Sequence, residues 1–287
     1  MTPLVEQLVN LALSEDVGRG DATARSVLFE PVMAKAQILA KEHLVVCGHD
    51  LAAFAMFRVD PSIKFEALVS EGSEVEPGTA IAQISGQGRA LLAGERTVLN
   101  FLMHLSGIAT LTRKYVKIVA ATGTKAKIVD TRKTTPGWRL LEKYAVACGG
   151  GANHRMDLAS GILIKENHIA MCDSTGEAVE RARKLAPHSL RIEVEVRSIE
   201  EMEEAIEAGT DVVLLDNMTP ETMAKAVAQA AGRVLIEASG GINLETVADV
   251  ARTGVDLISV GRLTHSAPAV DLSLQVVEAE IPADESE

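Results

Sequence analysis

The sequence predicts an α/β protein in which a small N-terminal α/β domain precedes an incomplete β/α barrel. At 287 residues the chain exceeds the size at which a single core usually stops growing, about 250 residues, so two domains are expected. Beyond Gly107, short apolar strands alternate with amphipathic helices, which is typical of a parallel sheet. The even spacing of these units and the lack of a Gly-rich dinucleotide turn favour a barrel over a doubly wound sheet.

The N-terminal part combines short elements of both kinds. Apolar side chains at helical spacing predict a first helix at 4–13, followed by a loop at 15–21. The further expected elements are strands at 34–46 and 63–70, a short helix at 49–58, a β-hairpin at 71–86 and a long apolar helix at 91–105. The hairpin has the pattern of a biotinyl or lipoyl carrier, but residues 65–90 contain no lysine to be modified. A carrier or scaffold module therefore stays an alternative that the missing lysine counts against.

The second part contains six predicted strands and five predicted helices. The strands are expected at 127–130, 161–165, 191–196, 211–216, 233–238 and 256–260. The helices are expected at 139–148, 174–186, 198–208, 219–231 and 243–253, several of them opened by a Ser, Thr or Asn cap. A complete barrel of this class has eight strands, so the barrel is expected to be incomplete.

Composition excludes several classes of protein. The net charge of −12 and an aromatic content of 3% argue against nucleic-acid binding. The apolar runs are far shorter than the roughly 20 residues that a membrane helix needs, and the N-terminus has no secretory pattern, so a cytoplasmic protein is expected. Three scattered cysteines predict neither a zinc site nor a disulfide framework.

The stretch K-I-V-D-T-R-K-T-T-P-G, residues 127–137, is the clearest candidate for a binding site. A short apolar strand is followed by two adjacent cations, Arg132 and Lys133, and by three threonine hydroxyls, the first of which is Thr131. Pro136 and Gly137 then end the segment. Cations and hydroxyls gathered in one turn are suited to a multiply charged anion, although in isolation a solvated basic turn would have the same pattern.

The ends of the other predicted strands carry charged residues as well. In β/α barrels the carboxyl ends of all strands meet at one face, where the chemistry takes place. The residues expected there are Lys165, Glu195, Asp216, Glu237, Ser239, Gly240, Gly241, Gly261 and Arg262, with His154 and Arg155 in the glycine-rich loop before the second strand. Because unpaired buried charge is costly, so many charges at one face favour a ligand site over a set of ion pairs. The Ser-Gly-Gly turn and the Gly261 turn are suited to phosphate, and the acids to Mg²⁺ or sugar hydroxyls.

The chain resembles the quinolinate phosphoribosyltransferases over essentially its whole length. Eight motifs carry the resemblance, in the family's order: E-D-V-G-R-G-D-A-T, E-R-T-V-L-N-F-L-M-H-L-S-G-I-A-T, D-T-R-K-T-T-P-G, G-G-G-A-N-H-R, I-K-E-N-H, E-V-E-V, L-L-D-N-M and S-G-G-I. The resemblance implies an N-terminal α/β sandwich, residues 1–108, and an incomplete barrel of six or seven strands, residues 109–267. It also implies that the C-terminal segment 268–287 joins the N-terminal domain.

The resemblance further implies the activity and the roles of individual residues. The family transfers the phosphoribosyl group of phosphoribosyl pyrophosphate to quinolinate with decarboxylation, giving nicotinate mononucleotide, CO₂ and pyrophosphate for NAD biosynthesis. Arg132, Lys133, His154, Arg155 and Lys165 would bind the dicarboxylate and the phosphates, with Thr131 beside them. Glu195 and Asp216 would face the ribose and its Mg²⁺, and Ser239, Gly240, Gly241, Val260 and Gly261 would hold the 5′-phosphate. Lys133, Lys165, Glu195 and Asp216 would be the catalytic residues.

Subunit structure follows from the same resemblance. Spacing alone makes Arg96 a surface residue, whereas the resemblance assigns it to the active site of a neighbouring subunit. A homodimer with shared sites is therefore expected, with a higher oligomer left open.

Two alternatives use the same fold. A molybdenum-transport-associated paralogue shares much of the motif set, and a Schiff-base lyase would use Lys165 as an amine nucleophile. A lysine surrounded by Arg132, Lys133 and Arg155 has the character of an anion ligand, which disfavours the lyase.

Overall fold

The computed structural model describes residues 1–280 and divides the chain into two compact units. Unit 1 contains Met1–Leu111, Pro136–Gly149 and the described residues from Ala267 on, and unit 2 contains Thr112–Thr135 and Gly150–Ser266. The expected segment 268–287 lies outside the described residues beyond position 280. Among residues 1–280, no helix has both the length and the apolar character needed to cross a membrane.

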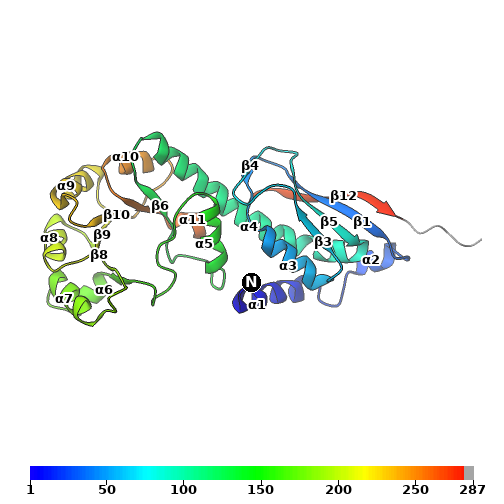
Figure 1. The fold of residues 1–287 in the computed structure, drawn as a ribbon, viewed down its shortest axis with the longest axis horizontal. Coiled ribbons are helices and arrows are strands. Elements are labelled where there is room, and N and C mark those ends of the chain that lie inside the picture. The colour runs from blue at the N-terminus through cyan, green and yellow to red at the C-terminus, as the bar shows by residue number, and fades with distance from the viewer. Residues whose placement is uncertain (281–287) are drawn as a thin grey trace, which may run out of the picture. The chain divides into compact units, whose positions relative to one another are not determined.

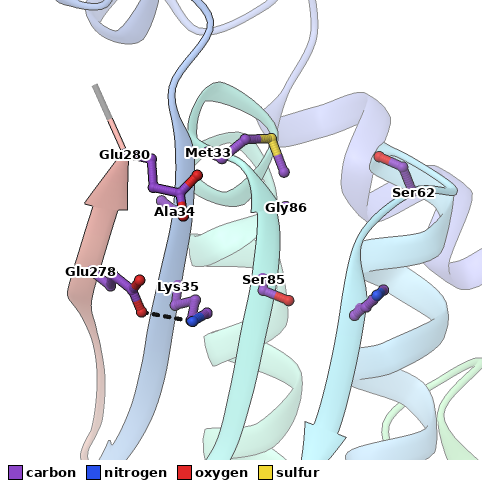
Figure 2. A pocket seen from close by; sticks show the side chains of 9 residues that line it. Met33, Ala34, Lys35, Ser62, Ser85, Gly86, Glu278 and Glu280 are labelled. Atoms are coloured by element: carbon purple, nitrogen blue, oxygen red, sulfur yellow. Dashed lines mark hydrogen bonds and ion pairs between the residues drawn. The ribbon is translucent and has the colours of Figure 1, made fainter. Parts of the chain in front are cut away.

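Unit 1 is built on an antiparallel four-stranded sheet with the order β12-β1-β5-β3. Its strands are β1 (Met33–Ala40), β3 (Lys64–Ala67), β5 (Ala80–Gln87) and β12 (Leu272–Glu280). Figure 2 shows β12 beside β1, with the 2.7 Å ion pair between Lys35 Nζ and Glu278 Oε2 drawn as a dashed line. The C-terminal strand therefore completes the edge of the N-terminal sheet.

The predicted hairpin at 71–86 is wrong. Its two halves, β4 (Glu74–Val75) and β5, belong to different sheets, because β4 pairs with β2 (Leu44–Val45). The backbone amide of Val46 donates to the carbonyl of Ser73, and the amide of Gly72 donates to the carbonyl of Val46. These contacts with a strand about 30 residues earlier replace the local pairing that the turn-rich sequence predicted.

Four helices accompany this sheet, and the last of them continues into unit 2 from Thr112 on. They are α1 (Pro3–Asp16), α2 (Ala22–Val27), α3 (His49–Val59) and α4 (Gly88–Ala121). The predicted helix at 91–105 is the first half of α4, which continues through Gly107. A Cβ atom at position 107 would collide with the backbone of Pro268, so glycine is needed here for a close approach of two chain segments.

Helix α5 (Arg139–Cys148) has the predicted bounds but groups with unit 1 instead of the expected 109–267 domain. The Trp138 ring lies 5.3 Å from Phe101 and 5.0 Å from His104, both on α4. His104 Nε2 also lies 3.0 Å from Oε1 of the fully buried Glu142. These contacts attach α5 to α4.

Unit 2 contains one parallel six-stranded sheet, which confirms the predicted incomplete barrel. The strands are β6 (Lys127–Val129), β7 (Ile162–Ile164), β8 (Ile192–Val196), β9 (Val212–Asp216), β10 (Leu235–Ser239) and β11 (Leu257–Ser259), in the order β6-β11-β10-β9-β8-β7. Among the described residues β6 and β7 do not pair, and a single bridge from Val129 to Ala152 extends the sheet beyond β6.

The helices of unit 2 follow the predicted alternation. They are α6 (Glu166–Ile169), α7 (Thr175–Leu185), α8 (Ile199–Glu207), α9 (Pro220–Ala230), α10 (Val247–Arg252) and α11 (Arg262–His265). Helices α7, α8 and α9 lie outside strands β8 and β9 (Figure 1). Ser174, Ser198 and Thr219 cap these three helices by accepting hydrogen bonds from backbone amides three residues later.

Candidate functional site

A cavity of about 320 Å³ lies at the carboxyl ends of the unit 2 strands. Residues from all parts of the unit 2 chain line it: Thr131, Arg132, Lys133, His154, Arg155, Leu163, Lys165, Leu214, Glu237, Ser239 and Ser259. Seven of these were predicted as site residues from the sequence. The fold therefore brings together cations that are spread over more than 30 positions of the chain.

Asp130 connects the end of β6 to the glycine-rich loop beside this cavity. Its carboxylate is fully buried and accepts hydrogen bonds from Asn153 Nδ2 (2.6 Å) and from the backbone amide of His154 (2.9 Å). Its own amide donates to the carbonyl of Ala152. Asp130 thus fixes the glycine-rich loop against the end of β6, which places Arg132 and Arg155 on the same cavity.

Two guanidinium groups lie close together there. Burial and the neighbouring charge of Arg132 lower the pKa of Arg155. Arg155 Nη1 donates to the carbonyl of Gly161 (2.8 Å), whereas the buried Nε atoms of Arg132 and Arg155 have no hydrogen-bond partner among residues 1–280. Like charges that are only partly compensated within the protein favour an anionic ligand.

Lys165 and two acids occupy the neighbouring strand ends. Lys165 Nζ lies 2.6 Å from Glu195 Oε2, and Asn217 Nδ2 donates to Asp216 Oδ2 at 2.9 Å. Glu195 is the last residue of β8 on the face that it shares with Glu193, and Asp216 is the last residue of the neighbouring β9. Each carboxylate keeps a second oxygen outside these two contacts, and carboxylate oxygens are suited to Mg²⁺.

A buried cluster of His154, Glu193 and Glu237 lies inside the barrel. His154 Nε2 lies 3.0 Å from Glu193 Oε2 and 3.8 Å from Glu237 Oε1. His154 Nδ1 accepts a hydrogen bond from the amide of Arg155 (2.7 Å), so Nε2 carries the hydrogen and points it at the acids. This tautomer has no lone pair on Nε2 for a metal ion, and the cluster is therefore a hydrogen-bonded one.

Glu237 is the most perturbed acid of the cluster. Its side chain is 1% exposed, and burial, together with the charge of Glu193, raises its pKa to about 7. Its Oε1 atom has no hydrogen-bond partner within the described part of the chain. Glu237 is thus neutral in about half of the molecules near pH 7 and changes charge within the physiological range.

The predicted phosphate-binding glycines occupy two turns. Gly240 and Gly241 have positive φ angles of 94° and 63°, and a Cβ at Gly240 would collide with the Asn217 side chain. A Cβ at Gly261 would lie 3.1 Å from Lys133 Cδ, so this turn packs closely on the cationic segment. The Val260 side chain is buried, its amide donates to the carbonyl of Val129, and its carbonyl accepts from the amide of Leu263, so both backbone groups of Val260 are engaged within unit 2.

The structure differs from the sequence-based prediction at four residues: Arg96, Glu193, Glu237 and Ser259. Arg96 is exposed on α4 of unit 1 and does not line the unit 2 cavity. Sequence reasoning placed Glu237 at a strand end without assigning it a role, and it missed Glu193 and Ser259 altogether. Alternation along the strands was the available signal, because Glu193 shares a face with Glu195, as Ser259 does with Leu257.

A second hollow lies on the sheet of unit 1. Residues of β1, β5 and β12 line it, as Figure 2 shows. Its volume is about 250 Å³. Lys35 and Glu278 neutralise each other across it. This surface therefore lacks the excess of one charge that distinguishes the unit 2 cavity.

Comparison with known proteins agrees with this geometry. Residues 21–106 match the model of the quinolinate phosphoribosyl transferase N-terminal domain, and residues 108–275 match that of the C-terminal domain. A probable nicotinate-nucleotide pyrophosphorylase (carboxylating) of Bacillus subtilis is 43% identical over 95% of this chain and 93% of its own length. A quinolinate phosphoribosyltransferase (decarboxylating) of Nicotiana glauca is 39% identical over 95% of this chain and 82% of its own. The structure of the nicotinate-nucleotide pyrophosphorylase from Francisella tularensis superposes with a TM-score of 0.90 at 42% identity, covering 96% of this chain and 98% of that one.

Proposed function

The chain belongs to the quinolinate phosphoribosyltransferase family, and we infer from this that it transfers the phosphoribosyl group of phosphoribosyl pyrophosphate to quinolinate with decarboxylation. The products are nicotinate mononucleotide, CO₂ and pyrophosphate, a step of NAD biosynthesis. The observation that carries this conclusion is the cavity in which Arg132, Lys133, Arg155 and Lys165 converge, because both substrates are multiply charged anions.

We propose that the cations divide between the two substrates. Arg132 and Arg155 are planar donors that suit the adjacent carboxylates of quinolinate, with His154 beside them and the hydroxyl of Thr131 near Lys133. Lys133 and Lys165 would neutralise phosphate charge. Ser239, the Gly240–Gly241 turn and the Gly261 turn are proposed to hold the 5′-phosphate through N–H and hydroxyl donors, with Val260 positioning the Gly261 turn.

The proposed chemistry needs no nucleophilic side chain. As pyrophosphate leaves, positive charge develops on the ribose, and Glu195 and Asp216 would stabilise it electrostatically. Lys133 and Lys165 would neutralise the departing group, and the cavity would hold the pyridine nitrogen in line with C1 of the ribose. The quaternary nitrogen then favours loss of the adjacent carboxylate, because the ring accepts the electron pair.

We further propose Mg²⁺ as the cofactor, with Glu195 and Asp216 as the residues that hold it together with the substrate. The support is chemical: these acids lie at the carboxyl ends of two neighbouring strands, and each has an oxygen outside its contact with Lys165 or Asn217. When bound, Mg²⁺ supplies charge neutralisation to the pyrophosphate group.

A homodimer with shared active sites is proposed as well. The support is the exposure of Arg96 together with its match to a family position that completes the neighbouring subunit's site. A cytoplasmic location is a further proposal, and fractionation would test it, since some plant relatives are named as mitochondrial or chloroplastic. The carboxylating and decarboxylating names of the relatives favour the transferase over the molybdenum-associated paralogue.

The proposed function is tested by product formation. Purified protein, quinolinate, phosphoribosyl pyrophosphate and Mg²⁺ should yield nicotinate mononucleotide, detected by chromatography. Nicotinate lacks the second carboxylate and should be a poor substrate, because it leaves a buried cation unpaired. A folded protein that makes no product, or that uses nicotinate as well as quinolinate, would contradict the proposal.

A further inference from the structure

The barrel interior contains a buried acid between two cavities. The substrate cavity opens at the carboxyl ends of the strands, and a second cavity of about 370 Å³ is lined by residues that begin strands, including Ile162, Val212 and Leu257. Only His154, Arg155 and Glu237 line both cavities within the described structure. Glu237 is therefore accessible in principle from two ends of the barrel.

The proposed reaction leaves one chemical requirement unmet by the cations. When the bond between C2 and its carboxylate breaks, CO₂ leaves and the electron pair remains on C2 beside the quaternary nitrogen. The product carries hydrogen at C2, so a proton must be delivered there. Without prompt delivery, CO₂ can recombine with the carbanion and the step is reversed.

The side chains around the substrate cavity differ in their capacity to supply this proton. The lysines of the cavity are proposed to pair with phosphate charge and the arginines with carboxylates, and the Nε2 hydrogen of His154 is directed at Glu193. Among the described lining residues Glu237 is the one with a carboxyl group. Its pKa of about 7 keeps a large neutral fraction at working pH, which is the condition for efficient general acid catalysis.

We propose that Glu237 is the general acid that protonates C2 of the pyridine ring after decarboxylation. This inference rests on the proposed function. The O–H bond of Glu237 breaks, a C–H bond forms at C2, and Glu237 is left as a carboxylate. Water in the second cavity then returns the proton to Glu237, so that no oxidant or further reactant is needed.

The surroundings of Glu237 determine its charge state. Glu193 on β8 and Asp130 after β6 disfavour its ionised form, while His154 and the Ser259 hydroxyl on β11 favour it. The carboxylate produced by the reaction has His154 Nε2 3.8 Å away, close enough for attraction but without a tight hydrogen bond. The acid can therefore lose its proton and regain it.

The proposal is tested by separating the two chemical steps in a single turnover. Enzyme in excess is mixed with phosphoribosyl pyrophosphate, Mg²⁺ and quinolinate labelled with ¹⁴C in the 2-carboxylate, and pyrophosphate and ¹⁴CO₂ are followed by rapid quench. In the wild type both should appear together. In Glu237→Gln, pyrophosphate should appear within a few-fold of the wild-type rate, whereas ¹⁴CO₂ should appear roughly a hundredfold more slowly.

Two further measurements separate proton donation from a structural role. Glu237→Asp, which retains the acid, should recover part of the ¹⁴CO₂ rate, and the exposed Glu207→Gln on α8 should behave as the wild type. In the wild type the ¹⁴CO₂ rate should fall as the pH rises through about 7, and this dependence should be absent in Glu237→Gln.

The results that would overturn the general-acid role differ from the result that would contradict the proposed function. If both products slow equally in Glu237→Gln, or if ¹⁴CO₂ keeps its rate, the general-acid role is overturned. A wild-type ¹⁴CO₂ rate that does not fall above pH 7 overturns it without any variant. A wild-type enzyme that forms no nicotinate mononucleotide would instead contradict the proposed function itself.

Discussion

The unusual protonation of Glu237 has a consequence for stability that does not depend on catalysis. Glutamate titrates near 4.5 in an unfolded chain, and burial raises the pKa of Glu237 to about 7 in the folded protein. Between these values the folded state binds more protons than the unfolded state, so the free energy of unfolding falls as the pH rises. At about 1.4 kcal/mol per pH unit, the complete loss amounts to roughly 3 kcal/mol.

Glu237→Gln removes this titration while keeping the shape of the side chain. Relative to the wild type, the variant should gain about 2.5 kcal/mol in the free energy of unfolding between about pH 5 and pH 8, because most of the interval between the two pKa values lies in that range. Urea denaturation followed by circular dichroism at both pH values measures this difference. The variant is compared with the wild type at each pH because other groups titrate in both proteins.

Glu207→Gln is the matched control, because it makes the same substitution at an exposed position on α8. An equal stability difference between Glu237→Gln and wild type at both pH values would refute the reasoning. So would a difference that changes in the opposite direction, which would mean that Glu237 is ionised more readily in the folded protein than in the unfolded chain.

Three other predictions concern separate parts of the chain. Gly107→Ala should lower the free energy of unfolding by about 1–3 kcal/mol, measured with urea, since its Cβ would meet the Pro268 backbone; an unchanged midpoint would contradict this. Asp130→Ala should cost about 1–3 kcal/mol because buried donors on the glycine-rich loop lose their acceptor, and it should lower kcat/KM for quinolinate. Arg96→Ala and Arg155→Ala should each be nearly inactive, while refolding them together should restore about a quarter of the activity if sites are shared by random pairing. Mixed dimers seen by mass spectrometry without recovered activity would rule out sharing through Arg96.

The sequence determined the elements whose signals are local. The six barrel strands lie within about two residues of their predicted bounds, because short apolar runs between capped helices leave few other structures. Helix α5 has the predicted bounds, and Ser174, Ser198 and Thr219 cap the helices that follow them. The cations Arg132, Lys133 and Lys165 were placed at strand ends, since parallel strands bring those ends to one face.

Tertiary structure decided the features that depend on contacts between distant segments. Residues 71–86 have the turn chemistry of a hairpin, yet β4 pairs with β2, because pairing is selected by the whole set of neighbouring strands. Gly107 would ordinarily suggest an interruption, but the helix continues because glycine there makes room for Pro268. Neither partner is near in sequence, so no local pattern reveals the choice.

The charge state of the barrel interior was likewise decided by the fold. Glu237 and Glu193 have ordinary strand positions in the sequence, where alternation shows only which face each occupies. The folded sheet buries both side chains and brings His154 Nε2 to 3.0 Å from Glu193 Oε2. An acid's pKa depends on its burial and its neighbours, and both are fixed only when strands distant in the chain come together.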